Sequence, residues 1–153
     1  MPHPPSAQPE SHGGGELRAA ARERRLRLAE VVRRQRDEFT CLAEVVLETP
    51  DGSRSSGSAE LPFNEQNYLR VVAQATLLAL ANVLGEHRLR LVGLRWLRIF
   101  DTRVVAVQVA FQEHEAHERL LLGIAVASDD SAAGAARAVL HATNRLIGNI
   151  VDR

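Results

Sequence analysis

An apolar run in the middle of the chain, LRVVAQATLLALANVL (residues 69–84), limits the possible folds more than any other feature. Residues 64–84 are predicted to form a helix, with Asn64 as N-cap, a hydrophobic staple between Phe63 and Tyr68, and Gly85 at the C′ position. A helix that is apolar nearly all round is covered on more than one side. Either a sheet and a second helix both contact it, or it is a self-association surface.

Strand-like segments lie on both sides of this helix. Residues 39–48 and 53–61 flank Thr49-Pro50-Asp51-Gly52, and an Asp-Gly pair between such runs predicts a hairpin. Further strands are predicted at 89–100, 103–113 and 119–127, followed by a helix at 131–148. The order β-β-α-β-β-β-α predicts an α+β domain over residues 39–153, a two-layer antiparallel sheet with helices on one face. The recurrence of sheet plus helix also suggests a tandem pseudo-repeat in topology.

The residues before this domain differ in composition. Residues 1–15 (MPHPPSAQPESHGGG) are rich in proline and glycine and predict a disordered tail. Residues 16–38 contain eight arginines and no glycine or proline, which predicts a basic amphipathic helix. One hypothesis is that this helix docks on the domain or on a second copy through Leu28, Val31 and Val32. The other is that it binds nucleic-acid phosphates through arginines on one side: Arg22, Arg25, Arg33 and Arg36.

Composition narrows the class of protein. The 153 residues include 19 arginines and 19 acidic residues, so no overall charge favours a nucleic acid or a membrane surface. The N-terminal residues lack the apolar stretch of a signal peptide, and no segment is predicted to span a membrane, so we expect a bacterial-type cytoplasmic protein. The single cysteine, Cys41, cannot form an internal disulfide and is expected to be a small buried apolar residue.

The chain lacks the short motifs that carry catalytic chemistry. It has no Gly-x-Ser-x-Gly, phosphate-binding P-loop, dinucleotide-binding glycine motif or Cys-x-x-Cys. The run 113–118 (EHEAHE) falls at a predicted hairpin tip, where a solvated turn is favoured over a metal site. Trp96 and Arg98 share a strand face and form either a stacking platform or a core tryptophan beside an edge charge. We therefore predict no catalytic residue, metal or cofactor.

A family resemblance lies in residues 119–148 (RLLLGIAVASDDSAAGAARAVLHATNRLIG). A strand leads through a glycine and small residues to an acidic cap, and then to an alanine-rich helix with an asparagine. This stretch resembles the C-terminal regulatory domain of 2-isopropylmalate synthases, which has two tandem strand–helix units and binds leucine at a dimer interface. The matching residues are Gly123, Ala125, Asp129, Asp130, Ala133, Ala136, Ala142 and Asn144. Two departures are Leu61-Pro62-Phe63-Asn64 in place of a glycine-rich turn, and the missing catalytic barrel.

The resemblance implies a non-enzymatic regulatory or scaffold domain that forms a homo-oligomer and binds a small-molecule effector. The candidate ligand-binding residues are Gly123, Ala125, Asp129 and Asp130, together with His141 and Asn144, which lie one turn apart on the last helix. The alternative is an RNA- or DNA-associated protein. From residue 53 onward the element order is similar to that of ribosome-hibernation and double-stranded-RNA-binding domains, although the two predicted helices carry few arginines.

Overall fold

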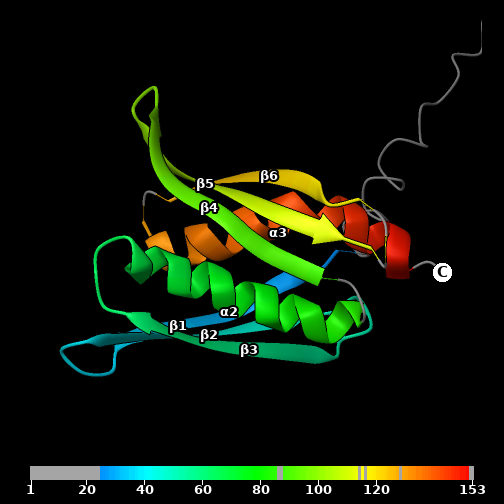
Figure 1. Ribbon diagram of the computed structural model, residues 1–153, viewed down its shortest axis with the longest axis horizontal. Helices are drawn as coiled ribbons and strands as arrows, with labels where there is room; N and C mark the ends of the chain where they lie inside the picture. The colour runs from blue at the N-terminus through cyan, green and yellow to red at the C-terminus, as the bar shows by residue number, and fades with distance from the viewer. Residues whose placement is uncertain (1–24, 86–87, 114, 116, 128, 152–153) are drawn as a thin grey trace, which may run out of the picture.

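The computed structural model describes residues 25–85, 88–113, 115, 117–127 and 129–151. The chain forms two units of three antiparallel strands and one helix (Figure 1). The first unit comprises β1 (Arg27–Gln35), β2 (Thr40–Glu48), β3 (Arg54–Pro62) and α2 (Asn67–Leu84). The second comprises β4 (Arg88–Ile99), β5 (Thr102–Gln112), β6 (Arg119–Val126) and α3 (Ser131–Val151). The predicted α+β class, the antiparallel strands and the element order from residue 40 onward are confirmed.

The predicted basic helix over residues 16–38 is wrong in its described part, because Arg27–Gln35 forms the edge strand β1. The strand pairs with β2, placing Leu28 opposite Leu47 and Val31 opposite Val45. Helix propensity is a weak preference that tertiary contacts override, and here the open edge of β2 supplies a ladder of backbone hydrogen bonds. Residues 1–24 lie outside the described residues, so the disordered tail over 1–15 and a helix before residue 25 stay predictions.

The two units repeat in detail as well as in order. In β1 a bulge skips Ala29 after Leu28, and in β4 a bulge skips Val92 after Leu91. Each third strand carries a glycine against its helix: a Cβ at Gly57 would lie 2.1 Å from the Ala75 carbonyl oxygen. The equivalent distance from Gly123 to the Ala138 carbonyl oxygen is 2.0 Å. The predicted tandem repeat is therefore present. Because β1 joins the first sheet, each of the two units has three strands.

Both helices lie between the two sheets (Figure 1). Helix α2 packs on β2 and β3, α3 packs on β5 and β6, and the two helices contact each other. In addition α2 contacts β4 and α3 contacts β1, so each helix bridges the two units. The first of the two explanations for the apolar run is thus correct: a sheet and a second helix cover it. By length and composition α2 could also cross a membrane, but 56 % of that stretch is buried within the fold.

The predicted helix ends and hairpin turn are largely confirmed. The rings of Phe63 and Tyr68 pack edge to face with centroids 5.8 Å apart, and Gly85 ends α2 with φ of 67°. The helix begins at Asn67 instead of residue 64, and the Asn64 side-chain oxygen accepts a hydrogen bond from the Asn67 N–H at 2.8 Å. In the β2–β3 turn, hydrogen bonds from Thr49 and then Ser53 lower the pKa of Asp51 to about 2.

Candidate functional site

The predicted ligand-binding residues on β6 and at the start of α3 serve packing and capping. Gly123 faces the α3 backbone, where even a Cβ would overlap the Ala142 nitrogen at 2.6 Å. Ala125 lies on the same face of β6 and is half-buried. Asp130 caps α3, and its Oδ1 accepts hydrogen bonds from the N–H groups of Ala132 and Ala133 at 3.0 and 3.1 Å. Asp129 lies exposed next to this cap.

The two candidates on α3 also lie along the contact between β6 and α3. His141 Nδ1 accepts a hydrogen bond from the backbone N–H of Ile124 at 3.0 Å, which satisfies one donor on the free edge of β6. The Asn144 Oδ1 is buried and has no hydrogen-bond partner among the described residues. These six candidates are therefore spread along one helix–strand contact, where His141 also lines a hollow of about 430 Å³ between β6 and α3.

The predicted nucleic-acid arginines do not form one helix face. The Arg33 guanidinium carbon lies 3.6 Å from the centroid of the Tyr68 ring, and the guanidinium donates to the Tyr68 carbonyl and the Ser131 hydroxyl at 3.2 and 3.4 Å. Arg33 thus ties β1 to the starts of both helices. Arg36 forms an exposed ion pair with Glu60 at 2.5 Å, and Arg25 is exposed ahead of β1. Arg22 lies outside the described residues, and nucleic-acid binding itself stays a prediction.

Other candidate chemical groups have structural partners. The Cys41 thiol is buried and donates to the Leu61 carbonyl at 3.4 Å, so the predicted role as an apolar core residue is confirmed. Arg103, not Arg98, lies over the Trp96 ring, at 5.3 Å from its centroid. Within the described parts of the chain, no group of three histidine, cysteine or acidic side chains is placed to bind a metal.

The outer faces of the two sheets, which point away from the helices, differ sharply. The outer face of β1–β3 carries mostly polar side chains: Glu30, Arg34, Glu44, Glu48, Arg54, Ser56, Ser58 and Glu60. Its largest exposed apolar side chain is Val32, at 36 %. The outer face of the second sheet, here called the β4–β6 face, instead exposes a continuous apolar set: Leu97, Ile99, Leu120, Leu122, Ile124 and Val126. Leu122 alone is 75 % exposed.

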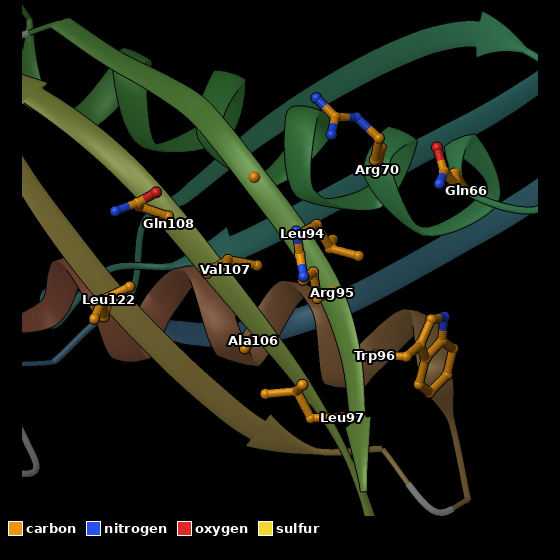
Figure 2. Close-up of a pocket in the computed structure, with 11 residues that line it drawn as sticks. Gln66, Arg70, Leu94, Arg95, Trp96, Leu97, Ala106, Val107, Gln108 and Leu122 are labelled. Carbon is orange, nitrogen blue, oxygen red and sulfur yellow. The ribbon is translucent and has the colours of Figure 1, made fainter.

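A hollow of about 660 Å³ opens on the β4–β6 face and extends around the edge of β4 to the start of α2 (Figure 2). Small residues at the β4 bulge and on β5, Gly93 and Ala106, leave room for it, and a Cβ at Gly93 would meet no atom within 4 Å. Leu97 and Leu122 bound the hollow on the sheet, while Arg95 and, from α2, Arg70 lie at its rim. Neither arginine has an ion-pair partner among the described residues. The hollow therefore combines apolar side chains and the amides of Gln66 and Gln108 with two arginines.

The β4–β5 hairpin projects beyond the helices at one end of this face (Figure 1). Its two-residue turn consists of Phe100 and Asp101, because Ile99 and Thr102 are the last paired residues. Phe100 is 93 % exposed and has φ of +54°, at a turn position where a positive φ normally selects glycine. A bulky residue in this conformation is an outlier, and such outliers concentrate at functional positions.

The sequence contains a signal for the β4–β6 face that none of the predictions used. A half-solvated antiparallel strand alternates apolar and polar residues, whereas residues 120–126 (LLLGIAV) are apolar on both faces. The inward-facing residues Leu121, Gly123 and Ala125 pack on α3. The residues between them therefore remain as exposed apolar surface: Leu120, Leu122, Ile124 and Val126. Absence of alternation in this edge strand thus indicates that apolar side chains are exposed on its outer face.

Comparison with known proteins adds no family to this picture. No protein-family model matches the chain, and no curated protein matches it.

Proposed function

We propose that this protein is a non-enzymatic regulatory or scaffold domain that self-associates through the β4–β6 face. The observation that carries the proposal is the contrast between the two outer sheet faces, one charged and one apolar. Monomeric proteins rarely expose contiguous apolar patches beyond a few hundred Å², and larger patches mark interaction sites. The resemblance of residues 119–148 to a dimeric regulatory domain supports the same class of function. A small-molecule effector stays a prediction.

The size of the surface fits a protein–protein contact. Taking about 200 Å² for a fully exposed large side chain, the six apolar residues of the face expose roughly 600 Å². The hairpin tip raises this to roughly 800 Å², which is the area that one partner contributes to a standard interface. Because an antiparallel sheet presents a regular, ridged surface, two such faces can pack at about 10 Å as in a β-sandwich.

The test is a matched pair of substitutions on the two outer faces. Val126→Asp places a charge on the β4–β6 face, and Val32→Asp makes the same change on the outer face of β1–β3. The exposed fractions of the two valines are 56 and 36 %, so both variants should fold. Sedimentation equilibrium of the unmodified full chain should give a dimer or larger assembly at micromolar concentration. Val126→Asp should weaken association at least tenfold, because a charge would be buried without a partner, and Val32→Asp should not.

Two results would contradict the proposal. One is a monomer at every concentration up to high micromolar. The other is an assembly that Val32→Asp disrupts and Val126→Asp does not, which would assign the interface to the charged sheet. Circular dichroism of each variant confirms that the fold is retained before the association is compared.

A further inference from the structure

The hairpin tip lies at the end of β4, and the hollow lies farther back along the same strand. The tip carries an aromatic ring, Phe100, that is 93 % exposed, followed by Asp101, which is fully exposed. The hollow offers an apolar floor at Ala106 and two unpaired guanidinium groups, Arg70 and Arg95, at its rim. Among the residues that the structure describes, Asp101 has one distant charged contact, to the Arg98 guanidinium at 3.9 Å.

We propose that two copies of this chain exchange hairpin tips, so that Phe100 of each fills the hollow of the other and Asp101 meets Arg95. This inference rests on the proposed self-association and names its geometry. A single chain cannot make the contact, because its own tip and hollow are separated along the strands of one sheet. A two-fold axis between two facing sheets makes it twice, since an isologous interface repeats every contact.

The register of β4 supports this arrangement. Phe100 and Leu94 lie equally far from Leu97 along the strand, and Leu94 lines the hollow between Gly93 and Arg95. An axis that crosses the strands near Leu97 therefore places the tip of one copy over the hollow of the other. The same axis sets Leu97 against its own copy, so the apolar centre of the face is covered as well.

The size of the hollow also fits the ring. An engineered cavity of about 150 Å³ accepts a benzene molecule, so a hollow of about 660 Å³ admits the ring of Phe100 with space for a neighbouring side chain. The one acidic residue of the turn, Asp101, can then meet Arg95, while Arg98 and Arg103 face each other one step farther back in the hairpin. Phe100 is exposed and has a positive φ of +54°, an unfavourable conformation for a bulky residue. Its presence at the tip is consistent with an intermolecular contact.

The variant Phe100→Gly tests the intermolecular contact without disturbing the fold. Glycine suits the positive φ of this turn, so the variant should fold with an unchanged or higher thermal midpoint at low concentration. Loss of the ring should weaken the dimer by about thirtyfold or more, which is the scale of a buried aromatic anchor. Ile99→Ala, one residue before the tip, serves as a comparison and should have a smaller effect.

A charge swap tests the pairing of Asp101 with Arg95. Asp101→Arg alone and Arg95→Asp alone should each weaken the dimer, because each leaves like charges facing across the interface. The double variant Asp101→Arg with Arg95→Asp should recover most of the affinity, which shows that the two sites couple. All four proteins are compared by sedimentation at low and moderate salt, and the effect of the single changes should shrink as salt rises.

A designed disulfide reports the geometry directly. In a Cys41→Ser background, which removes the only native thiol, Phe100→Cys and Ala106→Cys are introduced together. The two positions lie about 20 Å apart within one strand pair, so oxidation should yield a covalent dimer that is lost on reduction. Phe100→Cys with Ser58→Cys, on the outer face of β1–β3, is the control and should stay monomeric on a denaturing gel.

The outcomes separate this inference from the proposed function. A dimer that Val126→Asp disrupts but Phe100→Gly and the charge swap leave unchanged, without the designed disulfide, overturns tip exchange and leaves self-association standing. A chain that is monomeric at every concentration overturns both. A monomer whose native mass spectrum shows a bound small molecule, lost on Gly93→Trp, would assign the hollow to a ligand instead of a second copy.

Discussion

At the scale of single residues, two glycines determine how closely each helix approaches its sheet. Gly57 lies against the backbone of α2, and Gly123 lies against that of α3. The atoms that a Cβ would meet belong to the helix backbone and, at Gly123, also to the Ala142 Cβ, so neither helix can yield by rotating a side chain. Gly123, a candidate ligand-binding residue from the sequence, allows β6 and α3 to pack closely in the structure.

Gly57→Ala and Gly123→Ala should each lower the free energy of unfolding by about 3 kcal/mol, because overpacking a rigid contact costs about 1–3 kcal/mol and more when backbone must move. Gly93→Ala is the matched control, since its Cβ would enter open space, and its change should stay within about 0.5 kcal/mol. Urea unfolding at low micromolar concentration measures all three. Equal midpoints for the three variants would contradict the close approach.

At the scale of elements, β1 is the segment where local preference and final structure disagree. Its arginines and leucine favour a helix, yet it completes the first sheet and supplies Arg33 to the Tyr68 ring. The fold places Val31 inward, opposite Val45, and Val32 outward, opposite Glu44. A strand separates neighbouring residues onto opposite faces, whereas a helix keeps them on adjacent positions.

This difference gives a test of β1. Val31→Asp should destabilise the fold by about 2 kcal/mol or more, because it places a carboxylate against the core without a partner. Val32→Asp should change stability by no more than about 0.5 kcal/mol. Chemical denaturation of the two variants decides whether β1 is a strand or a helix. Similar losses of stability in both variants would contradict the strand.

At the scale of the whole molecule, the two units depend on each other. Each helix packs on its own sheet and on an edge strand of the other unit, α2 on β4 and α3 on β1. One three-stranded sheet with one helix would therefore leave an apolar helix surface in water. A unit of about 60 residues buries only about 60 % of its surface on folding, so its stability is marginal before this helix surface is exposed.

The full chain should accordingly unfold in one cooperative transition, and a fragment of residues 25–85 should not fold by itself. Circular dichroism with urea titration should show no cooperative transition for the fragment, since α2 would lose both α3 and β4 as cover. A fragment with a transition as sharp as that of the full chain would contradict the interdependence of the units.

The sequence by itself determined the elements whose signals are local. The Asp51-Gly52 turn, the staple of Phe63 and Tyr68, the Gly85 helix end and the Asp130 cap each depend on residues a few positions apart, and each is present in the structure. Strand-like and helix-like runs between turn signals likewise located β2 to β6 and both helices. These features follow from backbone geometry and short-range hydrogen bonds, which neighbouring residues specify.

Only the tertiary structure decided the rest. Arg27–Gln35 became a strand because the edge of β2 was open to pairing, a condition that lies outside the segment itself. The structure also decided that α2 is buried and that the surplus apolar surface lies on the β4–β6 face, because the helices cover only one side of each sheet. Which face of a strand meets solvent depends on what packs against it, and that is set by residues far away in the chain.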